Sequence, residues 1–162
     1  MRIFAIATVL LLTAAGASAQ SITVNRPQIS NDSARKMVDA CMAYAKANNI
    51  LVGVAVVGID GVLLDFHVSQ GGGPTLSETA VLKAKTAAHW RRPTKDLEEE
   101  VNKQVNGAPV WIGDFPRVGG IPIMIDGQFA GAIGIGGGSK WEECAQAAFD
   151  AVIPKNAQSA RN

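Results

Sequence analysis

The chain is poor in cysteine and aromatic residues, and neither sign of charge is in clear excess. Its two cysteines, Cys41 and Cys144, form no C-x-x-C pair, which excludes the motifs of zinc ribbons and thioredoxin-type redox centres. The 15 basic and 14 acidic residues give a formal net charge of +1 without a basic stripe. This balance argues against nucleic acid as a partner.

Motifs of several enzyme classes are also missing. Ser139 stands in Gly138-Ser139-Lys140 rather than in the G-x-S-x-G sequence of hydrolase nucleophiles. No two histidines are spaced i, i+4 as a hydrolytic metal site requires, and the glycines at 134–138 do not follow the dinucleotide-binding pattern G-x-G-x-x-G. The sequence therefore gives no support to these three kinds of site.

No stretch after the N-terminal segment is apolar enough to span a membrane. Arg2 precedes an apolar segment at 4–15, and residues 17–19 fit the small-residue pattern of a cleavage site. We therefore expect a signal peptide at 1–19, cut before Gln20. Removing 19 of the 162 residues leaves 143, with 14 basic and 14 acidic residues, which is enough for one domain. The expected product is exported, periplasmic or secreted, and not inserted in a membrane.

Within the exported chain we expect an extended arm at 20–29, a folded domain at 30–154 and a flexible polar tail at 155–162. An oxidising compartment allows the two cysteines to pair. Both lie on predicted helices at opposite ends of the domain, and a disulfide requires close Cα atoms. A disulfide and two separate buried thiols are therefore both open.

The most informative feature that is present is a glycine-rich stretch at 119–138. Two apolar runs in it are joined by Asp126-Gly127, a pair that favours the type I′ turn of a β-hairpin. Glycines crowd the end of the second run, and Ser139 with Glu142 forms a capping box that predicts a helix start. Bare backbone beside a helix N-terminus permits a close ligand or an anion. The alternative is a tight turn and a close helix–sheet contact.

Hydrophobic periodicity divides the remaining chain into helices and strands. No strand–helix–strand alternation repeats, which favours an α+β fold with an antiparallel sheet over a doubly wound fold. We expect a single domain with about five antiparallel strands flanked by helices. The predicted helices cover 31 to about 48, 75–90, 95–104 and 139–153, with caps at Ser30 or Asn31, Thr75 with Glu78, Thr94 and Ser139. The predicted strands cover 51–59, 62–69, 109–112, 117–120, 121–125 and 129–135.

Five short motifs follow one another along most of the chain, and in this order they resemble the GlcG/HbpS family, which includes the C-terminal domain of PduO-type proteins. The resemblance covers about residues 34–152. It implies a five-stranded antiparallel sheet flanked by helices, symmetric oligomers that are often octamers, and haem or related tetrapyrrole binding in some members. The motifs are Asp60-Gly61, Lys83-Ala84-Lys85-Thr86-Ala87, Gly119-Gly120-Ile121-Pro122, Asp126-Gly127 and Gly131-Ala132-Ile133-Gly134.

Two departures from the family pattern bear on the ligand. The family's arginine-containing segment after the second strand stands here as His67-Val68-Ser69. The family's G-V-S-G stands here as Gly134-Ile135-Gly136-Gly137. The residues that line a pocket therefore differ from those of other members.

The two histidines are the candidate metal ligands. Alternation in the strand at 62–69 predicts Asp65 and His67 on one face and Leu64 with Phe66 on the other. His67 is the first candidate, as a haem-iron ligand or a general base, and the alternative is a solvated histidine at a strand end. His89 lies near a helix end, where a cationic imidazole suits the helix dipole. We expect His67→Ala to weaken haem binding and His89→Ala to change little.

Cationic and glycine residues complete the candidate site. Lys83 and Lys85 face different directions on their helix, so at most one points into a pocket. Arg91, Arg92 and Arg117 suit carboxylates such as haem propionates, and the alternative for each is a solvated surface charge. The residues selected as ligand-binding are His67, Lys83, Arg117, Gly119, Gly120, Gly136 and Gly137, with His67 and His89 as metal ligands.

Three functions stay open on the sequence. The leading hypothesis is an exported small-ligand-binding protein for haem or a similar flat hydrophobic molecule. The second is a small enzyme without an organic cofactor that acts through His67 on a small carbonyl or aromatic compound. The third is an oligomeric sensory or accessory module. We expect a homo-oligomer, because a neutral surface does not oppose association between copies.

Overall fold

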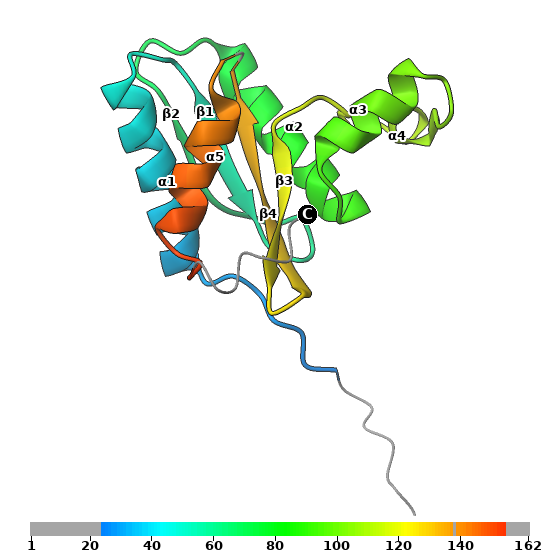
Figure 1. Cartoon of the computed structure of the whole chain (residues 1–162), viewed down its shortest axis with the longest axis horizontal. Helices are drawn as coiled ribbons and strands as arrows, with labels where there is room; N and C mark the ends of the chain where they lie inside the picture. Colours follow the sequence, from blue (N-terminus) through cyan, green and yellow to red (C-terminus); the bar gives the residue numbers. More distant parts are fainter. Residues whose placement is uncertain (1–23, 138, 155–162) are drawn as a thin grey trace, which may run out of the picture.

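A four-stranded antiparallel sheet forms the centre of the molecule (Figure 1). The computed structural model describes residues 24–137 and 139–154, so the predicted leader and tail lie outside the described residues. The fold is α+β as expected, but the sheet has four strands in place of about five. The strand order is β2-β1-β4-β3, with bounds β1 Gly53–Val57, β2 Leu63–Val68, β3 Gly120–Ile125 and β4 Gln128–Gly136.

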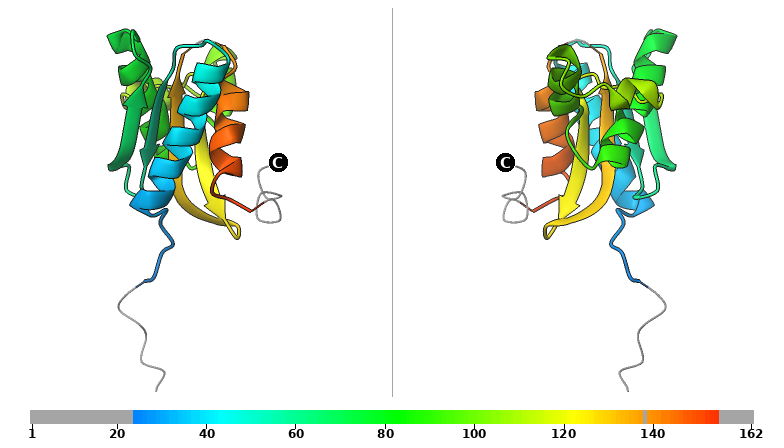
Figure 2. Two further views of the ribbon diagram at one scale, coloured as in Figure 1. Left: turned by 90° about the vertical axis from the view of Figure 1, so that its left-hand side faces the viewer. Right: turned by 90° about the vertical axis from the view of Figure 1, so that its right-hand side faces the viewer.

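Helices cover both faces of the sheet. Figure 2 shows α1 (Asn31–Ala47) and α5 (Trp141–Asp150) on one side of the sheet and α2 (Pro74–Trp90) on the other. The main hydrophobic core lies between the sheet and the helices α1 and α5. A smaller alanine-rich core lies between the sheet and α2. The helices α3 (Thr94–Asn102) and α4 (Ala108–Trp111) lie beyond β3 in Figure 1. In the described part of the chain, no helix combines the length and hydropathy of a membrane span.

Glycines in the sheet let α2 lie directly against strand backbone. A Cβ atom at Gly53 or Gly136 would fall on the carbonyl oxygen of Leu76, and one at Gly134 would fall on that of Ala80. The helix meets these glycines with small side chains of its own. Of the two alternatives for the glycine-rich stretch, the close helix–sheet contact is therefore the one that the structure shows at Gly134 and Gly136.

The two predicted strands at 109–112 and 117–120 are wrong. Pro109 lies in the first turn of α4, where its fixed φ and missing N–H suit a helix start. In the segment 117–120, part of the backbone hydrogen bonding is made with α3 and not with a neighbouring strand. The Thr94 hydroxyl donates to the Arg117 carbonyl oxygen at 2.7 Å. Only the last residue of that segment joins β3.

The start of α1 confirms its predicted cap, and the start of α2 does not. Ser30 accepts the N–H of Ser33 at 3.2 Å, which satisfies one of the free donors at the helix end. The capping box predicted at Thr75 is wrong, because α2 begins one residue earlier, at Pro74, after Gly73. Proline takes the first helical position without losing a hydrogen bond there.

The caps predicted for α3 and α5 are also wrong. Thr94 is the first residue of α3, and its hydroxyl turns inward to accept the N–H of Gly120 at 2.8 Å. Lys140, with φ of 54°, takes the cap position of α5 in place of Ser139. At α3 a contact between distant segments replaces the local capping pattern, whereas at α5 the cap moves by one residue.

The two hairpins differ in how well the sequence predicts them. Asp126 and Gly127 have φ of 48° and 74°, as the predicted type I′ turn between β3 and β4 requires. In the other hairpin a register shift interrupts the β1–β2 pairing. Leu64 therefore packs in the main core while Phe66 packs under α2, so the prediction that both share one face is wrong.

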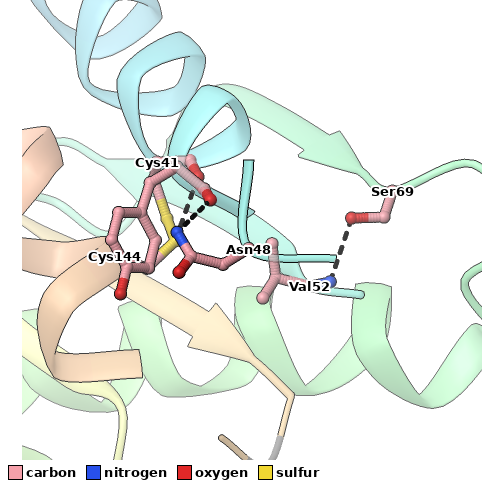
Figure 3. The surroundings of a disulfide bond; sticks show 6 residues. Cys41, Asn48, Val52, Ser69 and Cys144 are labelled. Atoms are coloured by element: carbon pink, nitrogen blue, oxygen red, sulfur yellow. Dashed lines mark hydrogen bonds between the residues drawn. A yellow bond between two sulfur atoms is a disulfide. The ribbon is translucent and has the colours of Figure 1, made fainter. Parts of the chain in front are cut away.

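Cys41 and Cys144 form a disulfide that joins α1 to α5 (Figure 3). Their Cα atoms are 4.6 Å apart, within the usual range for disulfides. Nearby, the N–H of Val52 donates to the hydroxyl of Ser69 at 3.0 Å, which holds the chain entering β1 against the end of β2 (Figure 3). The structure thus decides between the two alternatives in favour of pairing.

Candidate functional site

A pocket of about 480 Å³ lies at the C-terminal end of α2, and we call it the histidine pocket. Its walls come from the loop between β1 and β2, from the last turns of α2 and from the segment that follows α4. The pocket combines one imidazole with charges of both signs and with small apolar groups. The lining residues are Ile59, Asp60, Gly61, Lys85, Ala88, His89, Arg91 and Asp114.

Asp114 orients the imidazole of this pocket. Its Oδ2 lies 3.0 Å from His89 Nδ1 and accepts the Trp90 indole N–H at 2.6 Å. The loop that carries this carboxylate is held against α2, because Thr86 Oγ1 accepts the N–H of Phe115 at 2.8 Å. A carboxylate only accepts hydrogen bonds, so it assigns the Nδ1 proton to the neutral imidazole and leaves Nε2 with a lone pair.

Two cations flank the imidazole in the histidine pocket. Lys85 is one helical turn before His89 on α2, and Arg91 follows the last residue of that helix. Arg91 adopts the left-handed conformation (φ 51°, ψ 34°), and its guanidinium lies 5.3 Å from the ring centroid of Phe129. This placement leaves two cationic groups at the pocket for carboxylates of a ligand.

A second candidate site, which we call the lysine corner, surrounds Lys83 on the other side of α2, toward β3. Lys83 is buried, and its Nζ donates to the Ile135 carbonyl oxygen at 3.0 Å. Gly119, with φ of 117°, borders it so closely that a Cβ there would lie 3.2 Å from Nζ. Burial lowers the pKa of Lys83, and the charge of Arg117 adds to that effect while Glu98 opposes it.

Arg117 is tied to α3 at the edge of the lysine corner. Its guanidinium lies 2.6 Å from Glu98, whose other carboxylate oxygen accepts the N–H of Val118 at 2.8 Å. The side chain of Arg117 remains 61% exposed. Arg117 is therefore an ion-paired surface group beside Lys83.

The residues selected from the sequence as ligand-binding or metal-binding do not form one site in the structure. Lys83, Arg117, Gly119 and Gly120 meet at the lysine corner. His89 lies in the histidine pocket.

Gly136 ends β4 beside the first turn of α2, and Gly137 follows it beside the chain that enters β1. A Cβ at Gly136 would fall on the carbonyl oxygen of Leu76. Gly137 has φ of 135°, and a Cβ there would lie 3.0 Å from the carbonyl oxygen of Leu51. Both glycines border protein backbone, which limits the room for a ligand at these two positions.

His67 lies apart from both the histidine pocket and the lysine corner. It is exposed on the edge strand β2, paired with Val54 on the face of the sheet that α1 covers, whereas Lys83 comes from the opposite face. Asp65 shares that face, as predicted, but its carboxylate is paired with Arg35 of α1. The sheet therefore separates His67 from Lys83.

Asp114 is the residue that the sequence analysis missed. It lies in a loop after Gly113, in a segment that carried no chemical motif. The available signal was the loop composition of Gly113-Asp114, because functional groups concentrate in loops held by a rigid scaffold. The partner, His89, is 25 positions earlier in the chain, so no local spacing connects the two.

Comparison with known proteins agrees with this fold. The family model described as "Haem degrading protein HbpS-like" matches residues 29–150. Protein GlcG of Escherichia coli K12 is 34% identical over 111 residues, which are 66% of this chain and 80% of GlcG. The crystal structure of HbpS has a TM-score of 0.73 at 26% identity and covers 83% of this chain and 97% of its own.

A PduOC:heme complex shares the fold, with a TM-score of 0.72 at 24% identity, over 78% of this chain and 96% of that one. The resemblance expected from five short motifs is confirmed by these matches. The chain belongs to the HbpS-like family.

Proposed function

We propose that this protein binds haem in the histidine pocket, with His89 Nε2 as the iron ligand. The observation that carries the proposal is the 3.0 Å contact between His89 Nδ1 and Asp114. Histidines that ligate metals commonly donate their other ring N–H to a carboxylate, which fixes the ring and raises its basicity. The name of the family and the haem complex of PduOC support the choice of ligand.

The remaining residues of the pocket fit the same group. Lys85 and Arg91 supply cations for two propionates, and Ile59 and Ala88 supply apolar contact for a ring edge. In the described ranges, no three His, Cys, Asp or Glu side chains gather as a metal-binding set. Haem iron is already held by its macrocycle, so one ligand from the protein is enough to bind it. When bound, haem would supply iron for redox or oxygen chemistry.

Our proposal ranks His89 above His67, which reverses the order expected from the sequence. The carboxylate nearest His67 along its strand, that of Asp65, is paired with Arg35, whereas Asp114 is directed at His89. Ligand histidines commonly have a carboxylate partner, and of the two histidines it is His89 that has one within hydrogen-bond distance in the described residues. We therefore place the iron at His89 and keep His67 as the competing candidate in the experiment.

Replacing His89 with alanine is expected to weaken haemin binding by at least about tenfold, because the iron loses its protein ligand. Titration of the purified protein with haemin, followed at the Soret band, measures the dissociation constant and the coordination change. Asp114→Asn should weaken binding in the same direction by a smaller factor. The matched control is His67→Ala, which should bind like the wild type; loss of binding in this variant alone would move the site to β2.

We also propose that the protein is exported without residues 1–19 and forms a closed homo-oligomer. The leader pattern and the disulfide between Cys41 and Cys144 support export, since disulfides persist in oxidising compartments. The neutral net charge after cleavage supports association. Intact mass and light scattering of protein recovered from its native host are expected to give a chain that starts at Gln20 and a particle of several copies. A chain that keeps Met1, or a monomer, would contradict the respective half of the proposal.

A further inference from the structure

An exposed apolar surface covers α4 and the turns on either side of it. Trp111 is 84% exposed, and Val105, Val110 and Ile112 are each more than half exposed. We call these four residues the tryptophan patch. Single apolar residues are common on protein surfaces, but a tryptophan with three apolar neighbours in one short segment is typical of a surface that another molecule covers.

The indole ring of Trp111 is held in place on one side and lacks a hydrogen-bond partner. A Cβ at Gly107 would lie 3.2 Å from the ring, so the indole rests against the bare backbone of that glycine. The indole N–H of Trp90 donates to Asp114, whereas that of Trp111 finds no acceptor in the described part of the chain. Trp111 therefore offers a fixed apolar ring with one free donor.

A groove of about 490 Å³ between β2 and α2 has the matching chemistry, and we call it the α2 groove. Its apolar walls are the side chains of Phe66, Val81 and Leu82, and Ser77 and Glu78 are its polar residues. Within the described ranges, the carboxylate of Glu78 forms no ion pair and accepts no hydrogen bond. An apolar groove with one free acceptor suits an indole, whose body is apolar and whose polar group is a donor.

The tryptophan patch and the α2 groove lie at opposite edges of the molecule (Figure 1). The strand order β2-β1-β4-β3 places β2, which forms part of the groove, at one edge of the sheet. The patch lies beyond β3 at the other edge, on a helix that packs mainly against α3. The width of the sheet therefore keeps a chain from filling its own groove with its own tryptophan.

We propose that the tryptophan patch of one copy docks into the α2 groove of a second copy. The inference rests on the homo-oligomer proposed above and names its contact surface. The patch exposes roughly 500 Å², so covering it with an equal area of the groove removes about 1,000 Å² from solvent, the lower limit for a specific interface. Head-to-tail contacts of this kind generate a ring when the rotation between copies closes.

Light scattering of the purified protein, with one substitution on each surface, tests the contact. Trp111→Ser removes the indole, and Leu82→Asp places a charge in the groove. Each is expected to raise the dissociation constant of the oligomer at least about tenfold, because a tryptophan anchor carries much of an interface and a buried unpaired carboxylate opposes docking. Leu51→Ser and Leu51→Asp are the matched controls, since Leu51 is 53% exposed and lies outside both surfaces.

A disulfide trap identifies the two surfaces directly. Chains with Ile112→Cys are mixed with chains with Leu82→Cys under mild oxidation, and peptide mass spectrometry locates the link. We expect a link between these two positions, and none when Leu51→Cys replaces Leu82→Cys.

The outcomes separate this inference from the proposed oligomer. Circular dichroism first verifies that every variant keeps the fold. An oligomer that keeps its mass in Trp111→Ser or in Leu82→Asp, or that gives no link, would overturn the contact and leave the oligomer standing. A monomeric wild type would overturn both and assign the tryptophan patch to a different protein.

Discussion

Replacing Gly136 with alanine is expected to lower the free energy of unfolding by about 3 kcal/mol or more, or to prevent folding. A Cβ there would fall on the carbonyl oxygen of Leu76 and lie 2.7 Å from Thr79 Oγ1. The Leu76 oxygen belongs to the helix backbone, so no side-chain rotation relieves the overlap. The whole of α2 would have to move away from β4 and β1. Urea denaturation followed by circular dichroism measures the loss.

Gly73 provides the matched control for this experiment. It precedes α2, has φ of −76°, and a Cβ there would meet nothing within 4 Å. Gly73→Ala should therefore change the free energy of unfolding by less than about 1 kcal/mol. If Gly136→Ala cost no more than this control, the close contact between α2 and the sheet would not hold. Because α2 also carries His89, haemin affinity should fall together with stability in the Gly136 variant.

Removing the disulfide is expected to cost about 4 kcal/mol of stability. Cys41 and Cys144 are 103 positions apart, so the bond closes a loop that spans most of the folded domain. In the chain-entropy model, a loop of about 100 residues gives up to about 4.7 kcal/mol, because the cross-link restricts the unfolded chain. The comparison is wild type against the Cys41→Ala/Cys144→Ala variant in urea.

Dithiothreitol supplies the control for the disulfide prediction. Reductant should lower the urea midpoint of the wild type to near that of the double variant and should leave the double variant unchanged. Both sulfurs lie in the main core, so alanine removes some packing as well, and the variant should be slightly less stable than the reduced wild type. A wild-type midpoint that does not respond to reductant would contradict the bond between α1 and α5.

The parts of the fold that depend on local chemistry were predictable from the sequence. The Asp126-Gly127 turn follows from two positive φ angles that few residue pairs tolerate, and Ser30 caps α1 through a hydrogen bond within one turn. Periodicity located the strands that build the sheet, and the order of elements gave the α+β class. Five motifs in order were enough to indicate the family that the comparisons show.

The function of the glycines could not be predicted in this way. Bare backbone suits a ligand and a packed helix equally well, and the choice depends on where α2 lies relative to β1 and β4. The same holds for Thr94, whose hydroxyl satisfies β3 backbone 26 positions away in place of its own helix end. Local patterns describe what a residue can do, and the contacts of distant segments determine what it does.

The sequence by itself determined the class of the fold, four of its five described helices, its main strands and the residue types from which a site can be built. The tertiary structure decided which of them meet: Cys41 with Cys144, Asp65 with Arg35, and Asp114 with His89. The physical reason is distance along the chain. Hydrogen bonds and turns act over a few residues and leave a readable pattern, whereas pairs 25 to 103 positions apart depend on how the sheet and helices pack.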